Sequence, residues 1–210
     1  MNLAVIKEIV QTEMAEKHNP PRYIERSTKY AHGQRVASLV LRLRKLILPD
    51  KNEYDDILTV AAWCHDICHG VDNHWTAGAK RTKIILNGYC TPQELEQICS
   101  IIAVHDDRKP DSNYSDLIKI HQDADLLDHL GALEIWLHAA HIASRNGSIT
   151  NKLQYFLDTR PTEVTRWRDE LNYDVCKPIY DDKIGFAEVF MKRLAVEYNG
   201  GIWNEEALLP

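Results

Sequence analysis

Hydrophobic residues return every three to four positions along most of this chain, which is the spacing that places them on one face of a helix. The chain has only 9 glycines and 8 prolines, and they cluster between the periodic segments. Turn-forming stretches such as Asn87-Gly88 and Asn199-Gly200-Gly201 separate one segment from the next. The pattern therefore predicts an all-α fold.

The interruptions also place the individual helices. Thr91-Pro92-Gln93-Glu94 marks one helix start clearly, because it has the form of a capping box with proline at the first helical position. Asn146-Gly147-Ser148 predicts a boundary between a domain over residues 1–146 and a C-terminal helical extension over residues 147–210 that packs on it. The expected helices span about residues 3–17, 23–48, 57–70, 74–86, 92–105, 115–144, 150–176 and 183–198, with Pro161 as a potential break.

Composition places the chain among ordinary globular proteins. Its 210 residues are 44% hydrophobic and 27% charged, which suits one domain with a proper core and a helical extension. The net charge of −6 argues against tight binding to long nucleic acid, because such binding depends on many Lys and Arg contacts. The C-terminal helices carry no cluster of metal ligands, and we expect them to cover the core or to form a homo-oligomer.

The chain shows no sign of a membrane or secreted protein. It has no apolar run near the 18 residues that a transmembrane helix needs, and its amphipathic, acidic start excludes a secretory signal. The cysteines are odd in number and irregularly spaced, so they predict reduced thiols and a cytoplasmic protein. They lie at positions 64, 68, 90, 99 and 176.

The pair His65-Asp66 is the most informative feature of the chain. It lies in an apolar run that begins after Asp56, which predicts a helix buried on all sides. An ionised carboxylate is very costly to bury without a counter-charge. A divalent metal ion supplies that charge, and an adjacent imidazole is a usual co-ligand.

Further candidate ligands occur on both sides of this pair. His32 precedes it, and the acids Asp123 and Asp125 follow it. The two acids point about 200° apart on a helix, so that only one of them can approach the same ion. Two imidazoles and two carboxylates suit Mn, Fe, Co, Ni or Zn and, less well, Mg.

The order H…HD…D resembles the HD-domain metal-dependent phosphohydrolase superfamily. The pair stands in Ala-Trp-Cys-His-Asp-Ile and the last acid in Asp-Ala-Asp-Leu-Leu-Asp, and the resemblance covers roughly residues 28–140. It implies an HD-domain-like helical bundle that holds a metal ion between helices and hydrolyses phosphate esters. It also implies that the ligands are His32, His65, Asp66 and Asp125.

Other polar residues near the motif are candidates for supporting roles. His69 lies one turn after His65, His74 begins a helix where anions are favoured, and His105 ends a helix. The resemblance implies that such histidines can contact phosphate, act in catalysis or bind a second metal, and the alternative for each is a structural or solvent-facing side chain. Asp123, Asp128 and His121 are candidates for holding the ligands in place.

The sequence leaves the substrate and the class of enzyme open. Arg35, Lys80 and Arg81 are candidates for binding phosphate, although a solvated surface position explains each of them as well. Cys64 and Cys68 lie one turn apart, and buried packing explains them better than metal binding. We expect a phosphohydrolase for a small phosphorylated molecule, nucleotides included. The alternatives are a di-iron oxygenase with the same fold and a non-catalytic nucleotide-binding module.

Overall fold

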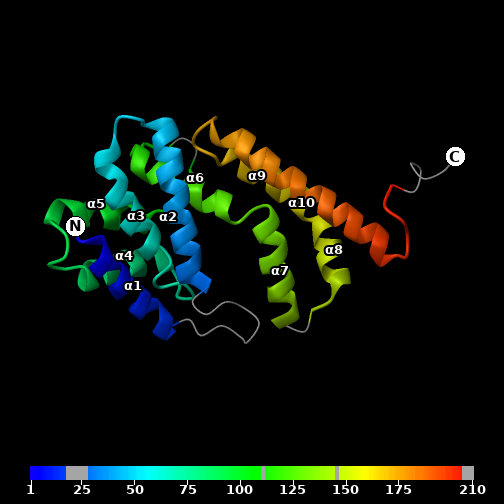
Figure 1. The fold of residues 1–210 in the computed structure, drawn as a ribbon, viewed down its shortest axis with the longest axis horizontal. Helices are drawn as coiled ribbons and strands as arrows, with labels where there is room; N and C mark the ends of the chain where they lie inside the picture. Colours follow the sequence, from blue (N-terminus) through cyan, green and yellow to red (C-terminus); the bar gives the residue numbers. More distant parts are fainter. Residues whose placement is uncertain (18–27, 110–111, 145–146, 205–210) are drawn as a thin grey trace. The chain divides into compact units, whose positions relative to one another are not determined.

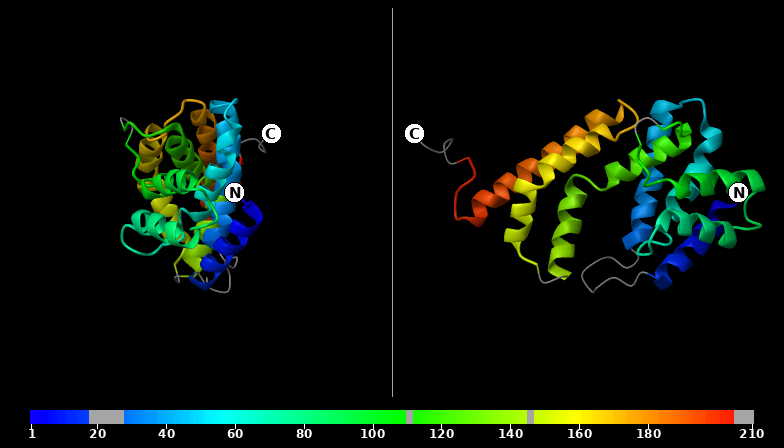
Figure 2. Two further views of the ribbon diagram at one scale, coloured as in Figure 1. Left: turned by 90° about the vertical axis from the view of Figure 1, so that its left-hand side faces the viewer. Right: turned by 180° about the vertical axis from the view of Figure 1, so that it is seen from behind.

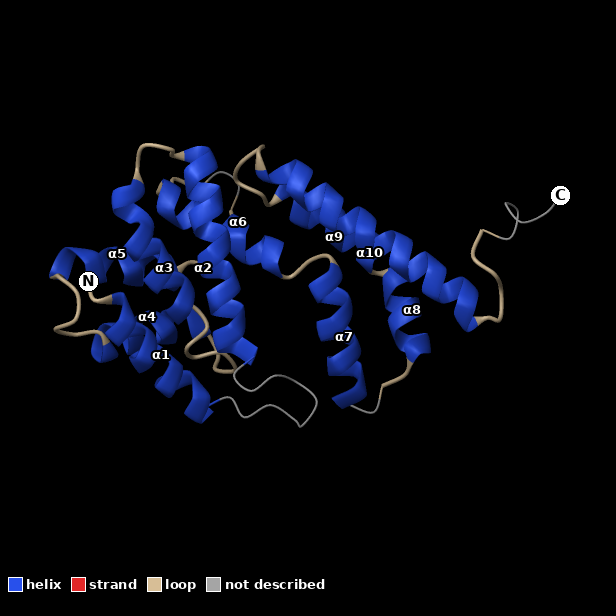
Figure 3. Cartoon of the chain, viewed as in Figure 1, coloured by secondary structure: helices blue, strands red, loops and turns tan. Residues whose placement is uncertain are grey.

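The computed structural model describes residues 1–17, 28–109, 112–144 and 147–204 (Figure 3). Within these ranges the regular elements are helices, apart from one isolated bridge between Asn87 and Cys90. The expected all-α fold is therefore confirmed. The helices are α1 (Leu3–Lys17), α2 (Thr28–Ile47), the 3-10 helix η1 (Asn52–Tyr54), α3 (Asp55–Cys64), α4 (His74–Ile85), α5 (Pro92–Ala103), α6 (Asp116–Asp128), α7 (Ala132–Ser144), α8 (Ile149–Asp158), α9 (Arg160–Asp169) and α10 (Cys176–Tyr198).

Contacts between residues divide the chain into two compact units. The first comprises Met1–Asp128 and Glu170–Cys176, and the second comprises His129–Asp169 and the chain from Lys177 onward. The chain first passes from one unit to the other after Asp128. The expected domain boundary at residue 146 stays a prediction. None of the helices in the described part is long and apolar enough to cross a bilayer.

In the first unit, α3 is the central helix. It packs against α1, α2, α5 and α6 (Figure 1), and its residues from Ile57 to Cys64 are buried. A Cβ atom at Gly33 of α2 would lie only 2.8 Å from the Ala62 carbonyl oxygen, so only glycine allows α2 and α3 to approach this closely. This close approach brings the residue before Gly33, His32, beside the end of α3.

Two predicted helices in the first part of the chain end earlier than the sequence pattern indicates. α3 ends at Cys64, and the chain makes turns from His65 to Gly70, which has a φ of +93°. The long helix predicted over residues 115–144 is in fact α6 and α7, separated at Gly131, which has a φ of +81°. Positive φ favours glycine and ends a helix. The predicted start of the second helix, at Tyr23, lies outside the described residues.

The C-terminal prediction also requires correction. The helix expected over residues 150–176 is divided into α8 and α9 at Thr159, next to the potential break expected at Pro161, which lies in the first turn of α9. α10 begins at Cys176, well before the expected start at residue 183, and Pro178 lies in its first turn. Proline is tolerated there because the first N–H groups of a helix have no partner within the helix.

The second unit has its own core and a buried ion pair. Leu153, Phe156 and Met191 form an apolar cluster between α8 and α10. α9 runs alongside α10 (Figures 1 and 2), where the Tyr180 hydroxyl donates a hydrogen bond of 2.7 Å to the Val164 carbonyl. The guanidinium of Arg160 pairs with the Glu134 carboxylate at 2.7 and 2.9 Å, and both side chains are buried.

The predicted capping box is present at the start of α5 and gives a test of local stability. Thr91 Oγ1 accepts a hydrogen bond from the Glu94 N–H at 3.3 Å, and Glu94 Oε2 accepts one from the Thr91 N–H at 2.8 Å. We expect Thr91→Ala to lower the free energy of unfolding by about 1 kcal/mol. Urea unfolding measures this, with the exposed Thr76→Ala in α4 as the control. Equal losses in both variants would contradict a capping role.

Candidate metal centre

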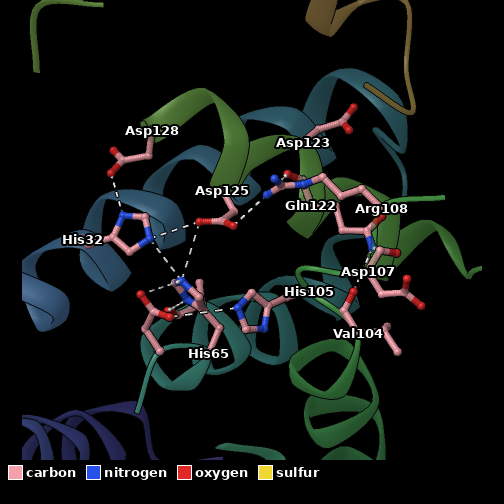
Figure 4. Close-up of polar contacts among 12 residues, drawn as sticks. His32, His65, Val104, His105, Asp107, Arg108, Gln122, Asp123, Asp125 and Asp128 are labelled. Atoms are coloured by element: carbon pink, nitrogen blue, oxygen red, sulfur yellow. Dashed lines mark hydrogen bonds and ion pairs between the residues drawn. The ribbon is translucent and has the colours of Figure 1, made fainter. Parts of the chain in front are cut away.

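The structure brings together the four side chains that the motif singled out. His32 comes from α2, His65 follows α3, and Asp125 comes from α6 (Figure 4). Asp66 is the residue after His65, and all four side chains are buried. His32 Nε2 lies 3.1 Å from His65 Nε2 and 3.0 Å from Asp125 Oδ1. His65 Nε2 lies 3.6 Å from Asp125 Oδ1 and 3.8 Å from Asp66 Oδ2. Nitrogen and carboxylate oxygen atoms thus converge on one small volume.

The opposite side of each imidazole ring is held by a hydrogen-bond acceptor. His32 Nδ1 lies 2.8 Å from Asp128 Oδ2, and His65 Nδ1 lies 2.8 Å from the Ala62 carbonyl oxygen. His105 has the same arrangement, with Nδ1 2.8 Å from the Ile102 carbonyl oxygen. A proton held at Nδ1 leaves the Nε2 lone pair facing the cluster, which is how metal-binding histidines are usually oriented.

This donor set fits a divalent metal ion. The possible ligand atoms of His32, His65 and Asp125 all lie within 4.8 Å of one another, as do those of His65, Asp66 and His105. The Nε2 atoms of His32 and His65 lie within hydrogen-bond distance of each other and of an Asp125 oxygen, or close to it. If both Nε2 atoms carried a proton, the two N–H groups would point at each other, so at least one lone pair faces the cluster. A cation satisfies all of these acceptors at once, and mixed nitrogen and oxygen ligands suit first-row transition ions.

The two central imidazoles differ in how readily they bind a proton. Complete burial lowers the pKa of His65 to about 4, although Asp66 and Asp125 act against this, so His65 is neutral near pH 7. Burial also acts to lower the pKa of His32, but its hydrogen bonds to Asp125 and Asp128 outweigh burial and raise that pKa to about 9. In the absence of an ion, His32 is therefore the imidazole that is protonated near pH 7, and it lies between the carboxylates of Asp125 and Asp128.

The additional histidines lie on one side of Asp66. Its Oδ1 atom is 3.5 Å from His74 Nε2 and 4.0 Å from His105 Nε2, and the two Nε2 atoms are 3.3 Å apart. His105 is buried, whereas the side chain of His74 is 19% exposed. His69 is exposed, and its ring centre lies 5.7 Å from that of His74. His74 and His105 therefore contact the cluster, and His69 lies at its edge.

The three residues considered for support lie in different surroundings. His121 is fully buried with its ring centre 5.1 Å from that of His65, and neither ring nitrogen has a hydrogen-bond partner among the described residues. Asp128 bonds to His32 and so orients that ring. Asp123 points away from the imidazoles in Figure 4 and accepts hydrogen bonds of 2.8–3.1 Å from Asn172 and Tyr173. It thus fixes the segment Glu170–Cys176 to α6.

Only one of the three expected phosphate-binding cations lies in the cluster. Arg35 forms hydrogen bonds of 2.9–3.1 Å to both carboxylate oxygens of Asp128. Arg81 instead pairs with Glu13 of α1 at 2.7 and 2.9 Å, and thereby joins α4 to α1. Lys80 is an exposed residue of α4. For Lys80 and Arg81, the structure therefore supports the alternative of a surface or packing role.

Sequence reasoning missed two cations and an amide that contact the cluster or support it. Lys29 Nζ lies 2.7 Å from Asp66 Oδ2, and Arg108 Nη2 lies 2.8 Å from Asp125 Oδ2. Gln122 donates hydrogen bonds to the Val104 and Asp107 carbonyls at 2.9 and 3.2 Å, which fixes the loop that carries Arg108. Lys29 lies one turn before His32, so helical spacing could have indicated it, whereas no spacing rule locates Arg108 in its loop.

The thiols near the motif do not belong to the centre. Cys64 is fully buried, and burial raises its pKa to about 12, so it stays protonated rather than acting as a thiolate ligand. Cys68 is partly exposed. Neither thiol appears in the groups of potential ligands found among the described residues.

Comparison with known proteins shows a likeness in structure rather than in sequence. No protein-family model and no curated protein sequence matches the chain. An HD-superfamily hydrolase from Bacillus thuringiensis is 21% identical, with a TM-score of 0.66 over 95% of this chain and 99% of that one. A predicted HD superfamily hydrolase from an uncultured Thermotogales bacterium is 20% identical, with a TM-score of 0.60 over 93% and 92% of the two chains. Bacillus subtilis YpgQ, in a complex with ADP, is 18% identical, with a TM-score of 0.61 over 91% and 94%. The chain therefore has the fold of the HD superfamily, as its H…HD…D residues predict.

Proposed function

We propose that this protein is a metal-dependent phosphohydrolase that acts on a small phosphorylated molecule, with nucleotides as the first candidates. The observation that carries this proposal is the convergence of His32, His65, Asp66 and Asp125, with their free nitrogen and oxygen atoms turned inward. The same fold occurs in proteins named as HD-superfamily hydrolases, which supports hydrolysis as the reaction.

The roles of the individual residues follow from their contacts. A bound Mn, Fe, Co, Ni, Zn or Mg ion would polarise a phosphoryl oxygen and lower the pKa of a bound water. His32, His65, Asp66 and Asp125 would hold that ion, while Asp128 fixes the His32 ring and is itself held by Arg35. The dry surroundings of His65 keep its lone pair free for binding.

His74 is the candidate for proton transfer. The His74 Nε2 atom lies beside Asp66 and His105. The side chain of His74 is more exposed than that of His105. Burial lowers the pKa of His74, which favours the neutral imidazole that can accept a proton. A positioned neutral imidazole of this kind suits general-base catalysis, in which it accepts a proton from the attacking water.

Two observations support a small, nucleotide-like substrate. YpgQ shares the fold and was crystallised with ADP. The net charge of −6 disfavours long nucleic acid as a partner, because such a partner needs many cationic contacts. The local positive charge that phosphate requires can come from the metal ion and from the cations around it.

A second candidate function is a di-iron oxygenase. It is favoured by the second group of potential ligands, His65, Asp66 and His105, with His74 Nε2 only 3.3 Å from His105 Nε2. The two functions differ in metal content and in co-substrate, because only the oxygenase consumes oxygen.

The test is metal analysis followed by assays on a panel of phosphate esters and nucleotides. We expect the metal-loaded protein to release phosphate or pyrophosphate from at least one of them. His65→Gln should lower that rate by at least about 100-fold. Replacing a residue that only hydrogen-bonds to a metal ligand already lowers activity by about 10- to 100-fold, and His65 is itself a proposed ligand. The control is His141→Gln, an exposed residue of α7. Binding of nucleotides without turnover would indicate a non-catalytic module, and iron with oxygen uptake would favour the oxygenase.

A further inference from the structure

Each carboxylate at the centre already has a cationic partner. Asp66 pairs with Lys29, Asp125 with Arg108, and Asp128 with Arg35. With neutral imidazoles, these three acids and three bases cancel in charge. A divalent ion would therefore leave the centre positive, which favours a multiply charged anion such as phosphate.

Arg35 and Arg108 each form an ion pair with a buried carboxylate, Asp128 and Asp125 respectively. Arg35 uses Nε and Nη2 on both oxygens of Asp128, in the bidentate geometry that makes such pairs strong. Arg108 donates from Nη2 to Asp125 and, at 3.4 Å, to the Gln122 carbonyl, and its side chain is only 13% exposed. Both residues therefore hold candidate metal ligands or their partners in place.

Lys29 differs from the arginines in how its unused donors are placed. Arg35 is held in a bidentate pair, and the Nε atom that Arg108 leaves without a partner is buried, whereas the Lys29 ammonium is partly exposed. This ammonium has three N–H donors, and among the described residues it bonds to Asp66 alone. Its side chain is 25% exposed, whereas that of Asp66 is 6% exposed. The ammonium therefore lies where the buried cluster meets solvent.

The neighbours of Lys29 place it on the accessible side of the centre. Asp66 Oδ2 faces Lys29, while Asp66 Oδ1 faces His74, whose side chain is 19% exposed. Lys29 and His74 thus flank the same carboxylate, at the part of the cluster that a solute can reach.

We propose that Lys29 is the residue that binds the phosphate group of the substrate at this centre and selects for its negative charge. The ammonium donates one hydrogen bond to Asp66 Oδ2 and keeps others for phosphate oxygens, so it serves both without breaking the ion pair. An ammonium on a flexible stem is a common phosphate-binding group in proteins. The phosphate-binding role of Lys29 rests on the proposed function in one respect: both assume that the metal ion and the phosphate group bind at this cluster.

The proposal predicts opposite effects on two kinds of ligand. A positive charge next to Asp66 repels a metal cation and attracts a phosphate anion. Removal of that charge should therefore strengthen metal binding and weaken phosphate binding. A residue that merely supports the local structure would weaken both when it is replaced.

The experiment compares Lys29→Gln with Lys45→Gln, an exposed lysine on the same helix. Titration calorimetry with Mn²⁺ measures metal affinity. The ³¹P line width of inorganic phosphate, with the protein in excess over Mn²⁺, measures phosphate binding. For Lys29→Gln we expect Mn²⁺ to bind several-fold more tightly and phosphate about tenfold more weakly, because a hydrogen bond to a charged group contributes about 1.5 kcal/mol or more. Lys45→Gln should change neither affinity.

Further variants keep the test decisive. Lys29→Arg retains the charge and should restore phosphate binding, and Lys29→Met retains the aliphatic stem if the glutamine variant does not fold. Unchanged phosphate affinity in the neutral variants, or a parallel loss of both affinities, would overturn the proposal. Phosphate binding that depends on Lys29 in a protein that hydrolyses no ester would leave this proposal standing and refute the proposed function. Ester hydrolysis by a Lys29→Gln protein with normal phosphate affinity would support the proposed function and refute the phosphate-binding role of Lys29.

Discussion

Replacement of Asp125 by asparagine should abolish tight metal binding, whereas Asp123→Asn should leave the metal in place. Asp125 Oδ1 lies 3.0 Å from His32 Nε2 and 3.6 Å from His65 Nε2, so its charge is directed at the proposed ion. Asparagine keeps a carbonyl oxygen but loses that charge, and it disturbs the pairing with Arg108 as well. We expect hydrolysis to be lost together with the metal, because both depend on the same carboxylate.

The Asp123→Asn variant is a matched control on the same helix. Asp123 accepts hydrogen bonds from the backbone N–H groups of Asn172 and Tyr173 and from the Asn172 amide. Its replacement should lower the free energy of unfolding by about 1–3 kcal/mol, because buried donors lose a charged acceptor. Metal analysis after gel filtration and urea unfolding separate the two effects. Retention of metal by Asp125→Asn, with its loss from Asp123→Asn, would reverse the assignment.

The sequence allowed the clustering of these side chains to be predicted, because the His65-Asp66 pair carries a strong local signal. The His65-Asp66 pair follows α3, whose residues from Ile57 to Cys64 are all buried, and a charged pair at the end of such a helix is conspicuous. His32 and Asp125 were assigned from their order relative to that pair. Their convergence depends on Gly33, which lets α2 approach α3, and no spacing rule predicts such an approach.

Other features depend on three-dimensional contacts that periodicity does not report. The hydrophobic period continues through Gly131, yet its positive φ separates α6 from α7. Charged residues show the same limit. The sequence offers Arg81 as a candidate for binding phosphate, whereas packing places it beside Glu13, and no spacing rule locates Arg108 beside Asp125. Partner choice among charged side chains is therefore the part of the site that sequence reasoning predicts least well.

Removal of the metal ion should lower the thermal stability of the wild-type protein near neutral pH. An ion that binds the folded chain alone stabilises it by about 2.7 kcal/mol when its concentration is 100 times the dissociation constant. For a chain of this size, that corresponds to a melting temperature about 5–10 °C higher with metal than with chelator. Thermal unfolding in the presence of Mn²⁺ or of excess chelator measures the difference.

The counter-ions determine how large the effect becomes. Without an ion, Asp66 and Asp125 would repel each other, but Lys29 and Arg108 each compensate one of them at 2.7 and 2.8 Å. We therefore expect the metal-free protein to remain folded, with the loss in stability set mainly by the lost binding energy. Asp66→Asn removes one ligand and one of the repelling charges, so the difference between its two melting temperatures should shrink towards zero. Identical wild-type melting temperatures with and without metal, at confirmed occupancy, would mean that these four side chains do not form a buried, charge-compensated metal centre.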